Sequence, residues 1–288
     1  MWDFTIVLFK FLSLVATAML LGGIFCFYLF GQTSLNTRLH IRNYIGVAVL
    51  IGLPASMLFF FSQIGAINQT GISGMFDFQL AGILAQSGLG DTTGLRVLGF
   101  ILGAGLALLL FRLNSILLAV GTALVIVSLT TSFGFIGHVS TLAIPARFSL
   151  SVHVMAMALW AGSFYPLWFI CGRENRLQVE RIMKKFGEIA VAIVAVLIIS
   201  GIYLLSQLLG SVEELFTTAY GISLTAKLVG VAALLLLAAA NKFRLVPGLQ
   251  KSSGETKLKR SIMLEMLVAL SVLVLTAFFT TLVGPQQA

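Results

Sequence analysis

Eight long apolar stretches constrain the fold of this 288-residue chain more than any other feature of its sequence. A helix needs roughly 20 apolar residues to cross about 30 Å of hydrocarbon, and each stretch is near that length. Hydrophobic residues make up 59% of the chain and charged residues only 10%, which excludes a soluble domain of this size. The expected spans lie near 4–30, 44–67, 93–111, 114–136, 148–171, 186–208, 222–241 and 262–282.

The apolar runs are continuous, whereas the strands of a membrane barrel alternate with a period of two over about ten residues. The sequence therefore predicts an all-α fold, a polytopic membrane helix bundle in which 1–288 form a single integral-membrane domain. Glycines inside the runs, such as Gly22-Gly23 and the pair Gly99 and Gly103, are predicted to let neighbouring backbones approach closely.

Basic residues gather in alternate loops, as expected for loops that stay in the cytoplasm. The opposite loops carry Asp77, Asp91, Glu213 and Glu214, with Arg147 as their one cation. This distribution predicts that both termini are periplasmic, and that the net charge of +8 serves contact with lipid headgroups and not with nucleic acid. The loops predicted to be cytoplasmic hold 14 of the 18 basic residues: Arg38, Arg42, Arg112, Arg173, Arg176, Arg181, Lys184, Lys185, Lys242, Arg244, Lys251, Lys257, Lys259 and Arg260.

Two of the three histidines occur close together in the sequence, around the turn between the fourth and fifth spans. His138 follows Gly137 at the end of the fourth span, and His153 lies in the first turns of the fifth. Met157 and Trp160 follow His153 at helical spacing and are expected on its face of the helix. We therefore expect both imidazoles at one membrane face, at matching depths.

Imidazole nitrogen together with a thioether suits copper, and suits hard ions such as Mg²⁺ or Ca²⁺ poorly. The candidate ligands are His138 and His153, with Met157 or, on another face, Met155. The residues alone leave a second interpretation open. His138 would then be an interfacial histidine bonded to a loop carbonyl, and His153 a buried histidine with a satisfied hydrogen bond.

Polar residues within the spans are costly unless they are paired or hydrated. Lys10 lies in the outer half of the first span, where it is able to snorkel or help close the histidine site, and Arg96 is expected to snorkel to the outer headgroups. Lys227 lies near the outer end of the seventh span, too far from Glu265 for direct pairing. Glu265 is expected to meet Asn241 or Arg244 at the inner face, as a structural pair or as an exit gate for a proton or metal.

Two cysteines, Cys26 and Cys171, fall near predicted cytoplasmic helix ends, where reducing conditions argue against a disulfide. We interpret each as a packing residue, with a role in relaying metal as the alternative.

Several segments together resemble the copper resistance D family of inner-membrane proteins, and the resemblance extends over essentially the whole chain. It is most specific over 137–166 and 226–265. The segments are Gly137-His138, His153 through Gly162 followed by Pro166, Ala226-Lys227-Leu228, Ala240 through Phe243, Val246-Pro247 and Leu264-Glu265.

The resemblance implies a multi-pass protein of the bacterial inner membrane that takes part in copper homeostasis, with copper, as Cu⁺ or Cu²⁺, at the histidines. It also implies a separate periplasmic copper-binding chaperone as partner and no enzymatic activity. Two alternatives remain: a membrane redox protein with His138 and His153 as axial haem ligands, and a non-transporting anchor that docks a periplasmic copper carrier.

Overall fold

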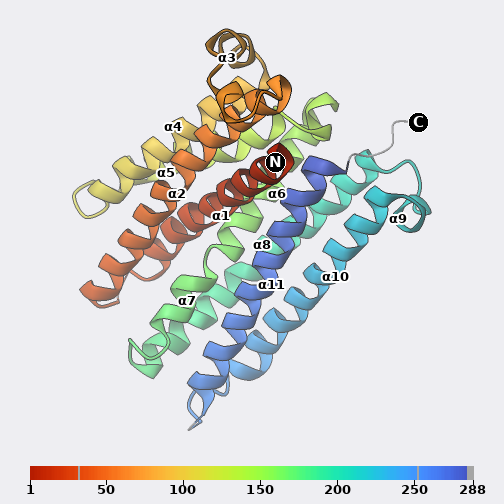
Figure 1. Ribbon diagram of the computed structural model, residues 1–288. Helices are drawn as coiled ribbons and strands as arrows, with labels where there is room; N and C mark the ends of the chain where they lie inside the picture. The colour runs from red at the N-terminus through yellow and green to blue at the C-terminus, as the bar shows by residue number, and fades with distance from the viewer. Residues whose placement is uncertain (32, 252, 284–288) are drawn as a thin grey trace.

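The computed structural model describes residues 1–31, 33–251 and 253–283, and over these ranges it contains helices and no β-strand. Eight helical segments are long and apolar enough to cross a membrane, which confirms the predicted all-α membrane bundle (Figure 1). The helices are α1 (Trp2–Leu29), α2 (Leu35–Asn68), η1 (Ile72–Phe76), α3 (Phe78–Ala85), α4 (Gly88–Leu109), α5 (Ser115–Thr131), η2 (Ser132–Gly134), η3 (His138–Thr141), α6 (Ile144–Ala161), α7 (Phe164–Ile170), α8 (Arg176–Leu208), α9 (Glu214–Thr217), α10 (Ala219–Ala240), η4 (Asn241–Leu245) and α11 (Gly254–Leu282).

Several helices begin well before the apolar stretch that predicts them. Helix α8 starts at Arg176, ten residues before the expected boundary at 186, and α11 starts at Gly254 where 262 was expected. Charged first turns continue these helices beyond the hydrocarbon, because their backbone bonds are made within the helix whatever the side chains. The side chain of Asn175 caps α8 by accepting a hydrogen bond from the amide of Gln178.

The fifth span is broken into α6 and α7 at Gly162 and Ser163, where the sequence predicts one continuous helix over 148–171. Pro166 has no N–H with which to bond the carbonyl four residues earlier, that of Gly162. The hydroxyl of Tyr44 in α2 donates to this carbonyl over 3.0 Å. A residue far away in the sequence therefore satisfies the acceptor that the proline leaves open.

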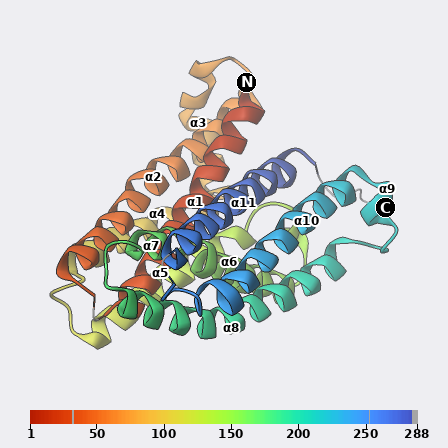
Figure 2. The ribbon, with the colours of Figure 1, turned by 90° about the horizontal axis from the view of Figure 1, so that it is seen from below.

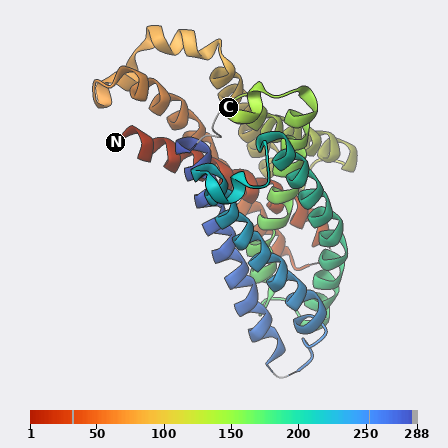
Figure 3. The ribbon, with the colours of Figure 1, turned by 90° about the vertical axis from the view of Figure 1, so that its right-hand side faces the viewer.

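Helix α1 lies at the centre of the bundle and packs against α2, α6 and α11 (Figure 2). Helix α6 packs in turn against α8, and α10 lies beside α11 (Figure 3). The start of α1 and the end of α11 lie at one end of the bundle, and the short connections that carry most basic residues lie at the other (Figure 1).

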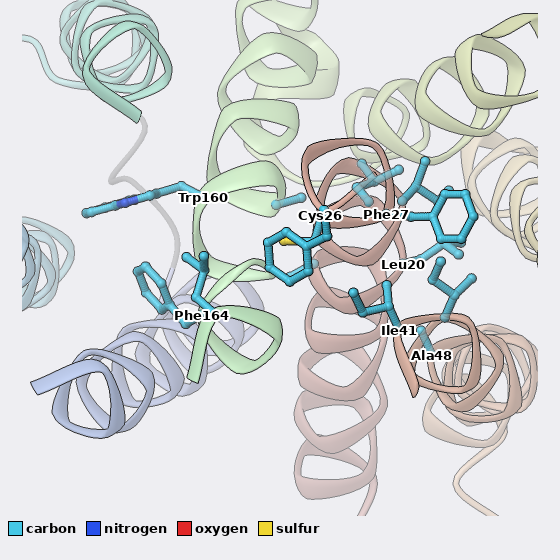
Figure 4. Packing of buried hydrophobic residues seen from close by; sticks show 14 of the residues in the cluster. Leu20, Cys26, Phe27, Ile41, Ala48, Trp160 and Phe164 are labelled. Atoms are coloured by element: carbon cyan, nitrogen blue, oxygen red, sulfur yellow. The ribbon is translucent and has the colours of Figure 1, made fainter. Parts of the chain in front are cut away.

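Small residues allow the helices around α1 to approach closely, as the glycine pattern predicts. A Cβ added to Gly22 would lie 2.2 Å from the carbonyl carbon of Gly162, and one added to Gly103 would lie 2.7 Å from Cδ2 of Leu20. Larger side chains fill the space on either side, with Leu20 and Phe27 on the side of α4 and Phe164 toward α11 (Figure 4). The core is thus built on backbone contacts across α1.

The segment between α2 and α4 forms two short helices, η1 and α3, which project beyond the bundle at the end where α1 begins (Figure 1). Asp77 caps α3 by accepting from the amides of Gln79 and Leu80, both over 3.0 Å. The amide of Leu80 and the side chain of Asn68 hold the pKa of Asp77 below its ordinary value. This cap fixes the start of α3.

Glu174, in the connection between α7 and α8, joins this connection to the start of α2. One carboxylate oxygen accepts from the hydroxyls of Ser34 and Thr37 and, over 3.2 Å, from the amide of Ser34. Burial would raise the pKa of Glu174, but these hydrogen bonds outweigh it, so the pKa lies below the ordinary value of 4.5. The ionised carboxylate therefore stabilises the fold fully above about pH 4.5. This stabilisation is lost as the pH falls through the lowered pKa of Glu174.

We expect Glu174→Gln to lower the free energy of unfolding at neutral pH by at most about 1 kcal/mol, because the group is only half-buried and water screens its charge. Thermal unfolding at pH 7 and at acid pH measures this effect, and the difference from wild type should vanish once Glu174 is protonated. Glu188→Gln, which changes an exposed carboxylate on α8, is the control. A larger deficit at acid than at neutral pH would contradict the assignment.

Candidate functional site

His138 lies on a short segment that carries the chain across the end of the bundle. Gly137 takes a φ of +79°, a left-handed conformation that favours glycine, and the 3₁₀ turn η3 starts at His138 directly after it. The exposed imidazole meets the ring of Tyr220, at the start of α10, edge to face with 6.3 Å between centroids. The backbone thus presents His138 outward, next to α10.

The electrostatic surroundings of His138 favour its neutral form. Partial desolvation and, next, the ammonium of Lys10 lower the pKa of His138 below its ordinary value of 6.5. The ring is therefore neutral at pH 7 and has a lone pair available for a metal ion.

His153 faces α8 from the outer half of α6. Its Nδ1 lies 3.1 Å from the carbonyl oxygen of Leu197 and 3.2 Å from Oγ of Ser200. Gly201 leaves room for the ring, since a Cβ there would lie 3.2 Å from Cε1 of His153. A carbonyl only accepts hydrogen bonds, so Nδ1 carries the proton and Nε2 keeps its lone pair.

The charges and rings of α10 act on the two histidines through different residues. His138 contacts Tyr220, and His153 lies within electrostatic range of the Lys227 ammonium. These two α10 residues are seven apart and so lie on one face, about 10 Å apart along the axis. In the described part of the chain, no group of three or more His, Cys, Asp or Glu side chains is placed to hold a metal ion.

The methionine nearest to His153 along the helix face packs in a small apolar cluster. Met157 lies against Leu14 of α1 and against Leu273 and Ala277 of α11. Met155 is half-buried on another part of the helix surface. The thioether of Met157 therefore lies on the inward side of His153, one helical turn away.

The two basic residues of the outer half differ in their surroundings. Nζ of Lys10 donates to the carbonyl of Thr280 over 2.9 Å and so joins α1 to α11. Arg96 is only 1% exposed, and its guanidinium carbon lies 4.4 Å and 5.6 Å from the ring centres of Phe133 and Phe59. The expectation that Arg96 snorkels to the headgroups is therefore wrong, because two aromatic faces hold the guanidinium inside the bundle.

Trp160 and Glu265 both line a cavity in the half of the bundle nearer the basic connections. Trp160 is 4% exposed and packs edge to face on Phe164, with 5.5 Å between ring centroids. The carboxylate of Glu265 accepts from Nδ2 of Asn241 over 2.8 Å. The predicted partnership of Glu265 with Asn241 is thus confirmed.

Cys171, at the end of α7, is a free and fully buried cysteine. Burial, and next the carboxylate of Glu255, raise the pKa of the Cys171 thiol to about 12. Because the thiolate is the form that binds metals, a neutral thiol here is a packing group at physiological pH.

The sequence does not predict an aromatic cluster that lies at the basic end of the bundle. His40 stacks on Phe169 with 3.6 Å between centroids, and its Nε2 lies 2.9 Å from the hydroxyl of Tyr165. Tyr165 also stacks on Tyr44, with 5.0 Å between centroids. The only sequence signal is the aromatic run in α7, and it gives no indication of a partner on α2.

Residues 180–279 match a family model described as Copper resistance protein D, the family that the sequence resembles. The matched region runs from the first turns of α8 almost to the end of α11 and includes Lys227, Asn241 and Glu265. His138 and His153 precede it. Comparisons with curated proteins and with solved structures give no significant match.

Proposed function

We propose that this membrane protein, whose residues 180–279 match Copper resistance protein D, binds copper at the end of the bundle where α1 begins and α11 ends, and moves it across the bacterial inner membrane. The family match supports a role in copper resistance or transport. The binding and movement of copper are inferred from the histidines, and no catalytic step is proposed.

The arrangement of His153 carries the proposal. A histidine that ligates a metal usually donates its other ring N–H to a carbonyl or carboxylate, which fixes the tautomer and the direction of the free nitrogen. The Nδ1 contact of His153 with the carbonyl of Leu197 is of this kind and leaves Nε2 to coordinate copper. Every neutral imidazole keeps one lone pair, and the contact with Leu197 fixes that lone pair on Nε2.

The two histidines act in sequence along α10 in this proposal. Copper first meets His138, which is exposed and neutral at the rim, and then passes inward to His153. Met157, one turn further along α6, supplies the soft thioether that Cu⁺ favours, and Met155 is the alternative sulfur ligand. Lys10 links α1 and α11 beside this route.

The distribution of charge supports an orientation and a partner. Basic connections at the far end of the bundle favour the cytoplasm for that end, which puts the histidines on the periplasmic side. We propose that a separate periplasmic copper-binding chaperone delivers the ion to His138. The basic end would contact anionic lipid headgroups.

Flux of labelled copper into proteoliposomes tests the transport step. We expect wild-type protein to admit copper faster than protein-free vesicles, and His153→Ala to reduce the rate to the protein-free level. Wild-type protein that binds copper without admitting it would contradict transport and would point to an anchor that only docks a carrier.

Copper capture should depend on pH through His138. Because protons compete with copper for the imidazole lone pair, and because the pKa of His138 lies below 6.5, we expect the initial uptake rate to be constant from alkaline pH to about 6.5 and to fall at lower pH. Uptake rates across this range in wild-type proteoliposomes measure the effect.

Lys10→Met is the informative variant for this pH dependence. Removal of the ammonium that lowers the pKa of His138 should move the midpoint of the pH profile to higher pH. An unchanged midpoint, or uptake that rises as the pH falls, would contradict the role given to His138.

A further inference from the structure

A cavity of about 240 Å³ lies in the inner half of the bundle, bounded by α6 and α7, α8, the end of α10 with η4, and α11. Its walls are mostly apolar and aromatic, with Trp160 and Phe164 on one side. Three polar side chains, Asn241, Lys242 and Glu265, also line it. A largely apolar cavity with a few convergent polar groups is the usual form of a binding site.

Glu265 is a buried carboxylate with few groups nearby that could stabilise its negative charge. It is 4% exposed, and its one hydrogen bond among the described residues comes from Nδ2 of Asn241. The ion pairs in that part of the chain lie elsewhere, at Arg176–Glu255 and Lys184–Glu180. A lone ionised carboxylate in such a setting is costly, so it demands a proton or a cation.

Asn241, the hydrogen-bond partner of Glu265, also carries an unsatisfied polar atom. It is 9% exposed, and its Oδ1 is buried without a hydrogen-bond donor in the described structure. Asn241 is also the first residue of η4, a π-helical turn, and such turns occur frequently at functional sites. Two underused oxygen acceptors, the carboxylate and Oδ1, thus lie on side chains that one hydrogen bond joins.

The charged groups around Glu265 do not supply this donor. Lys242 lines the same cavity, but its ammonium donates to the carbonyl of Gly187 in α8 over 2.9 Å. Glu188 of α8 and Arg260 of α11 are exposed. The segments of α6 and α7 at the cavity contribute Trp160, Phe164 and Leu167, none of which is charged at physiological pH.

The donor set is too small for a hard metal ion, since Ca²⁺ takes six to eight oxygen ligands and Mg²⁺ requires near-octahedral geometry. Copper in turn favours imidazole and sulfur over a lone carboxylate. A proton meets both requirements with no further ligand. It removes the charge of Glu265 and gives the acid an O–H that is able to donate to the Asn241 amide oxygen.

We propose that Asn241 and Glu265 form an inward-side proton-binding site, in which Glu265 takes up and releases a single proton through the cavity. Lys242 is placed to approach the carboxylate after the proton leaves, by exchanging its bond to Gly187 for one to Glu265. That this proton is the coupling ion for copper movement rests on the proposed function, whereas its binding to Glu265 does not.

Infrared difference spectroscopy of the full-length protein in lipid tests the site without copper. We expect a protonated-carboxyl band that weakens as the pH is raised, that is lost in Glu265→Gln and that is kept in the control Glu188→Gln. Asn241→Leu should move the midpoint of this titration, because it removes the hydrogen bond to the carboxylate. Unchanged helix content by circular dichroism shows that each variant is folded.

Absence of a titrating band assigned to Glu265 would overturn the proposal. A band that disappears on addition of sodium at constant pH would overturn it as well, in favour of a metal cation. In proteoliposomes, Glu265→Gln should keep copper binding and lose the dependence of copper flux on a pH gradient, and a retained dependence would overturn the coupling role. If wild-type protein moves no copper but the band still titrates, the proposed function fails and the proton site stands.

Discussion

Gly162→Ala should destabilise the protein by at least about 3 kcal/mol, near the upper end of the cost of overpacking a core. The added Cβ would lie 1.7 Å from the carbonyl oxygen of Ala18 and 2.5 Å from its carbonyl carbon. Both atoms belong to the backbone of α1, so no side-chain rotation relieves the clash. The same position ends α6 and receives the hydrogen bond from Tyr44, so a shift of α6 would break that bond too.

Thermal unfolding in detergent and the fraction of monodisperse protein after purification measure this effect. Gly46→Ala in α2 and Gly105→Ala in α4 are matched controls, because a Cβ at either position meets nothing within 4 Å. Within a helix such a change should stabilise by about 0.5–1 kcal/mol. Equal stability of Gly162→Ala and the two controls would contradict the close contact between α1 and α6.

His153→Ala should lower the affinity for copper by at least about 100-fold and abolish copper flux while leaving expression intact. Loss of a group that merely orients a ligand costs about 10–100-fold in affinity, and loss of the ligand itself should cost more. The ring contacts α8 through Leu197 and Ser200, so a modest loss of thermal stability is also expected. Isothermal titration with copper and flux in proteoliposomes are the measurements.

His40 supplies a control of the same residue type. It lies at the basic end of the bundle, stacked on Phe169, so His40→Ala should keep both affinity and flux. A second variant, His153→Gln, retains a side-chain donor for the carbonyl of Leu197 and should separate folding from metal binding. Wild-type copper affinity in His153→Ala would exclude this residue as a ligand.

The sequence predicts the membrane bundle because a bilayer leaves a spanning chain few choices: each crossing must satisfy its backbone internally and must be long enough. The eight spans follow from apolar length alone. The break at Gly162 does not follow from apolar length, because the hydroxyl that satisfies the Gly162 carbonyl belongs to Tyr44 on another helix. The early start of α8 at Arg176 escapes hydropathy because the first turns are charged.

Some contacts of the site residues are likewise predictable from the sequence, and others are not. That Glu265 pairs with Asn241 or Arg244 is predictable, because these residues lie at the adjoining ends of two consecutive apolar stretches, 222–241 and 262–282; the structure shows Asn241. The aromatic enclosure of Arg96 depends on how α2, α4 and the η2 turn are rotated about their axes, which hydropathy does not specify. For the same reason the contacts of His138 with Tyr220 of α10 and of His153 with Leu197 of α8 emerge only from the structure.

Copper content of the purified protein, wild type against the double variant His138→Ala, His153→Ala, tests the central claim most directly. After loading with copper and removal of excess metal, wild type should retain copper and the folded double variant should retain none. Equal copper content in the two proteins would contradict the histidine site. A Soret band that is present in wild type and absent from the variant would show instead that the histidines bind haem.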